Sequence, residues 1–189
     1  MCTRYRVGAS GKKLAERYGA VEAACDAPGV EAFPKRRGWA VCAVKGELRL
    51  GTMGWGFPPP PNGRAPVVNV RNLASPFWRD ALARPAQRCL VPVTEFCEWE
   101  GEAGRKRDRW FSVPSLEIFS FAGIWRQTAA GPVYAFLTCA PNALVAPVHP
   151  KAMPVILHPE DEARWLSGNI AEVLPLAAPF PSQLMALAE

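Results

Sequence analysis

The most reactive arrangement in the sequence lies at its start, where Met1 is followed by Cys2. If Met1 is removed, Cys2 carries a free α-amine and a thiol, whose ordinary pKa values are near ~8 and ~8.5. Such a 1,2-aminothiol captures an aldehyde in two steps, because the amine forms a Schiff base and the thiolate then closes a five-membered thiazolidine on the same carbon. A cysteine after an initiator can equally be incidental, so its context in the chain decides.

Short motifs spread along the chain supply that context. In order they are Met1–Tyr5, Trp55-Gly56, Asn69–Asn72, Arg88–Pro92 with Phe96–Trp99, and Pro147–His149 with Met153–Leu157. A further motif, Phe121–Trp125, lies between the last two of these. Each motif is weak by itself. In this order and at these spacings, the chain from Cys2 to about Leu166 resembles the SOS-response-associated peptidase (SRAP) family of abasic site processing proteins.

The resemblance implies a catalytic set of four residues. Cys2 matches the family nucleophile, which crosslinks to an abasic site and also releases the initiator methionine. Asn69 matches the asparagine that positions the Cys2 amine, and Glu98 matches the glutamate that serves in proton transfer and methionine removal. His149 matches the histidine that helps to open the abasic sugar. The implied product is a covalent thiazolidine crosslink between Cys2 and the ring-opened abasic site in single-stranded DNA, formed after autoproteolytic loss of Met1.

The family resemblance also concerns the partner. Arg4 and Arg71 match arginines that hold DNA phosphates, a role that suits the bidentate guanidinium. The implied partner is single-stranded DNA containing abasic sites, with no cofactor, no metal and no membrane. We expect a monomer in the cytoplasm of a bacterial-type cell, associated with the nucleoid when it is bound to DNA.

Elementary chemistry agrees with the implied roles. An abasic sugar is mostly a closed hemiacetal, and His149 can give and take a proton near neutral pH to open it. Schiff-base formation expels water, so a carboxyl whose pKa is raised by apolar neighbours is a useful acid, and Glu98 lies between Cys97 and Trp99. Asn69 can accept a hydrogen bond from an amine without adding charge.

Three positions depart from the family pattern. Thr3 stands where glycine is common, and its Cβ narrows the approach to Cys2. Three residues separate His149 from Met153, where many relatives have two and an arginine before the methionine; Lys151 could supply that charge. The prolines of Phe57–Pro61 follow Trp55-Gly56 in place of a second tryptophan.

Two other classes of function stay open at this stage. One is a self-processing peptidase in which Cys2 and Glu98 act on the Met1 peptide bond and DNA binding is incidental. The other is a non-covalent single-strand binder that uses a basic surface. A strand-cleaving lyase is a variant of the crosslinking hypothesis, because elimination competes with ring closure at the same Schiff base.

Charge and composition are compatible with a DNA partner. The net charge is +5, and residues 157–189 hold five acidic residues against one basic residue, whereas the rest of the chain holds 21 basic against 12 acidic residues. A basic body of this kind suits a polyanion. No run of about 18 apolar residues predicts a membrane span, and the amino terminus lacks the apolar core of a secretion signal. The six cysteines are expected to be thiols, and with two histidines and no CxxC pair they predict no structural zinc site.

The secondary-structure pattern must place these residues. Helices are predicted over Ser10–Tyr18, Ser75–Ala83 and Pro159–Leu166, with a helical turn at Pro141–Val145. Strands are predicted over Trp39–Val44, Leu48–Thr52, Arg88–Val93, Phe96–Glu100, Trp110–Val113, Ile118–Ile124, Val133–Cys139 and Met153–Leu157, with a charged hairpin loop at Gly101–Arg109. Together they predict one α+β domain over residues 1–189. Its core is an antiparallel, barrel-like sheet with a few short peripheral helices, and residues 167–189 form a peripheral tail.

Overall fold

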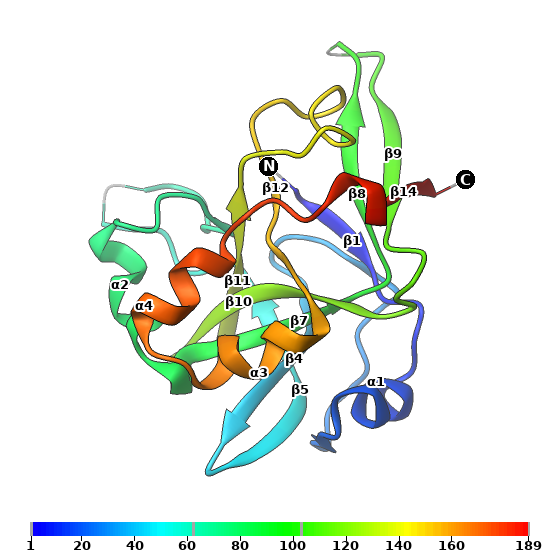
Figure 1. Ribbon diagram of the computed structural model, residues 1–189. Helices are drawn as coiled ribbons and strands as arrows, with labels where there is room; N and C mark the ends of the chain where they lie inside the picture. Colours follow the sequence, from blue (N-terminus) through cyan, green and yellow to red (C-terminus); the bar gives the residue numbers. More distant parts are fainter. Residues whose placement is uncertain (1, 62, 103, 189) are drawn as a thin grey trace.

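The computed structural model describes residues 2–61, 63–102 and 104–188 of the chain (Figure 1). The strands are β1 (Arg4–Arg6), β2 (Val21–Glu22), β3 (Glu31–Ala32), β4 (Arg37–Val44), β5 (Glu47–Trp55), β6 (Asn69–Val70), β7 (Arg88–Val93), β8 (Glu95–Glu100), β9 (Arg107–Ser112), β10 (Phe119–Thr128), β11 (Gly131–Cys139), β12 (Met153–Pro154), β13 (Ile156–Leu157) and β14 (Ala186–Ala188). The α-helices are α1 (Gly11–Tyr18), α2 (Pro76–Ala83), α3 (Pro159–Ser167) and α4 (Ile170–Val173). Short 3₁₀ turns cover Pro85–Gln87, Leu174–Leu176 and Ser182–Leu184.

The first helix follows directly from local signals in the sequence. The Ser10 side chain accepts a hydrogen bond from the Lys13 amide and so caps α1. Leu14 and Tyr18, four residues apart, are the buried residues of this helix. The next helix, α2, begins in the same way after Ser75, with a proline at its first position. Both helices confirm the sequence prediction.

Five strands close into a barrel in the order β4, β5, β11, β10, β7 and back to β4. Most neighbours are antiparallel, and Val41 of β4 lies opposite Leu90 of β7. The ring closes where β5 runs parallel to β11, so that Trp55 lies opposite Tyr134. Because the five strands form a closed ring, each of them pairs with a neighbour on both sides. The predicted α+β fold with a barrel-like sheet is confirmed, and the parallel β5–β11 pairing is an addition to the predicted antiparallel arrangement.

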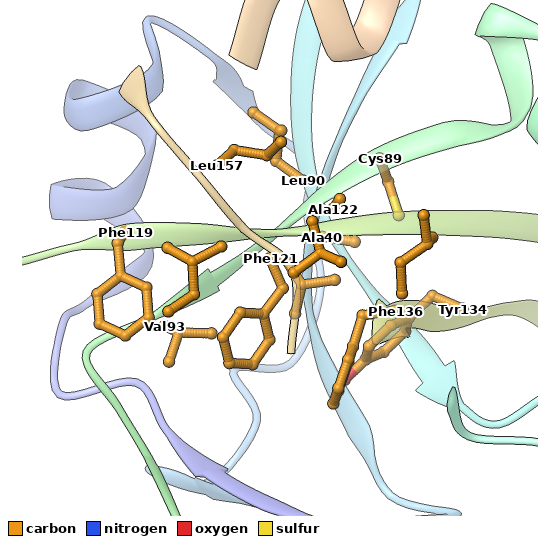
Figure 2. Close-up of a cluster of buried hydrophobic side chains, with 14 of the residues drawn as sticks. Ala40, Cys89, Leu90, Val93, Phe119, Phe121, Ala122, Tyr134, Phe136 and Leu157 are labelled. Carbon is orange, nitrogen blue, oxygen red and sulfur yellow. The ribbon is translucent and has the colours of Figure 1, made fainter. Parts of the chain in front are cut away.

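Buried aliphatic and aromatic side chains form one cluster in the core, with the rings of Phe121, Tyr134 and Phe136 among them (Figure 2). The rings of Phe121 and Phe136 lie 4.8 Å apart between centroids, and both are fully buried. Tyr5 of β1 reaches this cluster from outside the ring of strands, with its ring 5.2 Å from that of Trp55. Its hydroxyl forms a hydrogen bond with the hydroxyl of Tyr134. The barrel core therefore anchors the segment that follows Cys2.

A second sheet has the strand order β14, β9, β8, β1 and β3. It contacts the barrel core through Tyr5 of β1. The amino-terminal strand β1 is an internal strand of this sheet and pairs with both β3 and β8. The last strand, β14, comes from the predicted tail and pairs with β9. The same tail buries Val173, Phe180 and Met185, so residues 167–188 contribute to the core as well as covering it.

Two predicted segments differ in extent from the structure. Strand β9 begins at Arg107 instead of Trp110, because the cross-strand pairing continues to Glu100 opposite Arg107 and shortens the predicted loop Gly101–Arg109. The predicted helical turn at Pro141–Val145 lies within irregular turns that continue to Val148. Among the described residues, no helix is long and apolar enough to cross a membrane.

Candidate active site

The pairing of β1 with β8 brings the start of the chain to Glu98. Arg4 lies opposite Cys97 and Tyr5 opposite Phe96 in an antiparallel register. Cys2 is buried, with 1% of its surface exposed. Its Sγ donates to the carbonyl oxygens of Arg4 at 3.4 Å and of Cys97 at 3.8 Å. The first residues of a chain are usually poorly ordered, whereas these hydrogen bonds fix the position of the Cys2 side chain.

Glu98 is a buried acid whose surroundings change its protonation. It shares a face of β8 with Phe96, whose ring packs on Phe121 at 5.8 Å, and this face points into the core. Only 1% of Glu98 is exposed, and its Oε1 has no hydrogen-bond partner among the described residues. Burial raises the pKa of Glu98 from 4.5 to about 7. The carboxyl can therefore release and accept a proton at neutral pH.

The Cys2 thiol is protonated in this environment. Burial raises its pKa well above 9.0, and the negative charge of Glu98 raises it further. Since the thiolate is the reactive form, the thiol needs a base at the moment of attack. Glu98 is close enough to act on the thiol electrostatically and has a pKa suited to that task.

Asn69 presents a second unpartnered acceptor. It lies in β6, which runs parallel to β11, with Asn69 opposite Phe136. Its Nδ2 donates to the Val68 carbonyl at 3.1 Å, and the indole Nε1 of Trp55 donates to the same oxygen at 3.0 Å. The amide orientation is therefore fixed, and it leaves Oδ1 buried without a hydrogen-bond partner in the described part of the chain.

His149 ends the irregular segment before β12. Its amide donates to the Val145 carbonyl at 2.8 Å. Its Nδ1 lies 2.8 Å from the Ala152 carbonyl and 3.2 Å from the Ala152 amide. The shorter contact favours a proton on Nδ1, which leaves Nε2 as the basic nitrogen of the ring. Burial lowers the pKa of His149, so the neutral ring is favoured at pH 7.

Asn142 is a positioning residue that sequence reasoning missed. Its Oδ1 accepts hydrogen bonds from the amides of Leu144 at 3.1 Å and Val145 at 3.0 Å. Its Nδ2 donates to the Phe180 carbonyl at 2.7 Å. The asparagine thus shapes the turn that carries His149 and ties it to the tail. An asparagine two residues before a turn amide is the local signal that could have found it.

Both halves of the site adjoin strand β11. The ring of Tyr5 lies 6.2 Å from that of Phe136, the residue opposite Asn69. Two residues further along β11, Thr138 pairs with Pro154 of β12, the strand that follows His149. The fold thus places Cys2 beside Glu98 and places Asn69 and His149 at the neighbouring end of the barrel. Met1, on which the predicted self-processing acts, lies outside the described residues.

The two predicted phosphate ligands differ in their surroundings. The guanidinium of Arg4 is bound by Glu31 at 2.7 Å and by Asp108 at 2.5 Å, and it lies 5.0 Å from the Trp110 ring centroid. It is therefore already satisfied by two carboxylates. Arg71 is exposed just after β6, at the same end of the barrel as Asn69. Of the two, Arg71 is the one whose charge is available beside the site.

The positions that depart from the family pattern fall around the same end. Thr3 is half-buried and Lys151 is exposed beside His149. Phe57 is buried and pairs with Val67, so it anchors the start of the proline loop in the core. Across the described residues, no group of three or more His, Cys, Asp or Glu side chains is placed to hold a metal ion.

Comparisons with known proteins relate this chain to one family. The sequence model of the SOS response associated peptidase (SRAP) family matches residues 1–189. The abasic site processing protein YoqW is 31% identical over 136 residues, both in Bacillus subtilis strain 168 and in Bacillus phage SPbeta. That match covers 63% of this chain and 58% of YoqW, so the chain spans less than two thirds of the length of this relative.

Solved structures share the fold. A crystal structure of a protein from Bacteroides thetaiotaomicron has a TM-score of 0.83 and 24% identity, over 98% of this chain and 90% of that chain. A protein from Bordetella bronchiseptica also has a TM-score of 0.83, with 21% identity over 99% of this chain and 98% of that chain. A phage-related protein from the same organism has a TM-score of 0.79 and 20% identity, covering 99% and 93%.

Proposed function

The chain belongs to the SOS response associated peptidase family, and from this premise we propose that it processes abasic sites in DNA by covalent capture at Cys2. The named relative, YoqW, is an abasic site processing protein, and it is similar to 63% of this chain. The observation that carries the proposal is a buried Cys2 close to Glu98, with acceptors on both Glu98 and Asn69 that find no hydrogen-bond partner among residues 2–61, 63–102 and 104–188. Buried acceptors without donors are rare in folded proteins, and a substrate-bound or terminal amine would satisfy them.

The proposed reaction begins when Cys2 becomes the first residue. Its α-amine attacks the aldehyde carbon of the ring-opened abasic sugar and gives a carbinolamine. Loss of water then gives a Schiff base, for which Glu98 supplies the proton to the departing hydroxyl. Asn69 Oδ1 accepts a hydrogen bond from the amine and holds it in place. The role of His149 is to move a proton through Nε2 as the hemiacetal opens.

Ring closure completes the capture. The Cys2 thiol gives up its proton to the now ionised Glu98, and the sulfur adds to the Schiff-base carbon. The addition turns the protonated Schiff-base nitrogen, which has kept its proton, into the neutral ring amine of a thiazolidine. The net change is loss of one water on joining the aminothiol and the aldehyde. The burial that keeps the thiol protonated at rest protects it until a carbonyl is present.

The test is an SDS-resistant adduct with a single-stranded oligonucleotide that carries one abasic site. Wild-type protein is expected to shift by the oligonucleotide mass less one water, and Cys2→Ala is expected to give no shift. Cys97→Ala is the matched control, because Cys97 is also a buried thiol and neighbours Cys2. An unmodified wild-type protein, or an adduct that survives in Cys2→Ala, would refute covalent capture at this residue.

A second candidate is self-processing by the same residues. The pKa of Glu98 near 7 allows it to activate a nucleophile beside the Met1–Cys2 peptide bond. Intact-mass analysis of freshly made protein is expected to show Met1 lost in the wild type and retained in Glu98→Ala. Cleavage of a second peptide in trans would extend this candidate to a general peptidase, and its absence would limit the activity to the chain's own start.

A further inference from the structure

The hairpin formed by β8 and β9 places an arginine directly across from Glu98. In the antiparallel register Glu98 lies opposite Arg109, so both side chains leave the same face of the hairpin. The hairpin projects from the body of the molecule (Figure 1). Glu98 is buried at its base, whereas Arg109 is 43% exposed in its side chain. Arg109 therefore stands at the solvent side of the catalytic carboxyl.

Arg109 does not neutralise Glu98. Its Nε donates to Oε2 of Glu100 at 2.7 Å, while Oε1 of Glu98 has no partner among the described residues. Glu100 is 38% exposed in its side chain. Exposed ion pairs of this kind are weak, because water screens both charges and two long side chains must be ordered. The guanidinium can therefore exchange one anion for another at little cost.

The charges around Arg109 favour an anion larger than one carboxylate. Arg107 lies on the same face, opposite Glu100, and is exposed. The acidic residue of β9, Asp108, points to the opposite face and is bound there by Arg4. The face that carries Glu98 thus has two arginines at its rim, Arg107 and Arg109. Its one exposed carboxylate, that of Glu100, is already paired with Arg109.

We propose that Arg109 binds a backbone phosphate next to the abasic nucleotide, and that Glu100 is an internal anion that this phosphate displaces. The inference rests on the proposed function, since a lesion held at Cys2 and Glu98 brings its own backbone to the rim of the hairpin. Arg109 is then a positioning residue that fixes the strand relative to Glu98. Glu100 competes with the phosphate for the Arg109 guanidinium. It therefore weakens the binding of any DNA strand that does not place a phosphate within reach of Arg109.

Fluorescence anisotropy with a tetrahydrofuran-containing single strand, an abasic analogue without an aldehyde, tests this exchange. Arg109→Gln is expected to weaken binding about fivefold and to reduce the slope of log affinity against log salt by about 0.7. Glu100→Gln is expected to tighten binding about threefold, because the guanidinium is released. In the Arg109→Gln background the Glu100→Gln change is expected to have no effect, since the competition is gone.

The matched controls are Arg164→Gln and Asp161→Asn, which alter another exposed arginine–carboxylate pair, with a contact of 2.6 Å on α3. Both are expected to leave affinity and salt slope unchanged. Equal effects of Arg109→Gln and Arg164→Gln, or tightening by Glu100→Gln that persists without Arg109, would reduce the effect to net charge and overturn the proposal. If the wild-type protein formed no adduct with an aldehyde-bearing strand, but the anisotropy results were as expected, covalent capture alone would be overturned.

Discussion

The buried carboxyl of Glu98 makes the stability of this protein depend on pH in a defined direction. Its pKa in the folded chain is about 7, against an ordinary value of 4.5. A raised carboxyl pKa means that the folded state prefers the neutral form. The stabilisation by neutral Glu98 is therefore fully present below pH 4.5 and is lost as the pH rises through 7.

The magnitude follows from the difference between the two pKa values. One pKa unit corresponds to about 1.36 kcal/mol, so a shift from 4.5 to about 7 is worth about 3 kcal/mol. Because Glu98 is 1% exposed, solvent screening does not reduce this figure as it would at the surface. Glu98→Gln keeps the shape of the side chain but cannot ionise. Any constant cost of burying the new amide is the same at every pH.

Urea unfolding of the wild type and of Glu98→Gln, measured from about pH 4 to about pH 8.5, isolates the effect. The free energy of unfolding of Glu98→Gln minus that of the wild type is expected to rise by about 3 kcal/mol across this range. The thiol of Cys2 is present in both proteins, so its ionisation in the unfolded chain contributes equally to both free energies and cancels in their difference. A difference that stays flat with pH would show that Glu98 is solvated, and it would remove the basis for its role as a neutral-pH acid.

Three further predictions concern individual side chains. Asn69→Leu is expected to slow adduct formation about tenfold in single-turnover gels, while urea unfolding changes by less than about 1 kcal/mol, since the oxygen of the lost amide accepts no hydrogen bond within the described part of the chain; a normal rate would contradict amine positioning. His149→Gln is expected to slow capture of an abasic site about 100-fold but to spare capture of a simple open-chain aldehyde, which needs no ring opening; equal losses on both substrates would refute the ring-opening role. Arg88→Met is expected to destabilise the fold by about 2–4 kcal/mol in urea unfolding, because it leaves the buried Trp165 carbonyl and the partly buried Gly168 carbonyl without their donor; unchanged stability would show that these carbonyls find other donors.

Local physics accounts for the parts of the fold that were predictable. A helix start needs a capping oxygen and a buried face four residues apart, and Ser10, Leu14 and Tyr18 supply both within nine residues. The β4–β5 hairpin needs two residues of positive φ, and Lys45 and Gly46 have φ values of 52° and 84°. Such signals are complete within the segment that they shape, so no distant contact is required to recognise them.

Pairings between distant segments were outside the reach of those signals. Barrel closure depends on β5 meeting β11 about 80 residues later, and this parallel contact has no turn to announce it. The same holds for the ion pairs of Arg4 with Glu31 and Asp108, which occupy a guanidinium that the family pattern assigns to DNA. The strand at Asn69 is only two residues long, too short for alternation to reveal it.

The sequence by itself determined which functional groups exist and that they follow the order of one family. They are an aminothiol that forms at Cys2 once Met1 is removed, the amide of Asn69, the carboxyl of Glu98 and the imidazole of His149. Only the tertiary structure decided their state. Glu98 acquires a pKa near 7 because β8 turns it toward the core, and Cys2 stays protonated because its own side chain is buried near Glu98. Protonation depends on the solvent and charges around a group, and those neighbours come from distant segments: Cys97, which contacts Cys2, is 95 residues away in the chain.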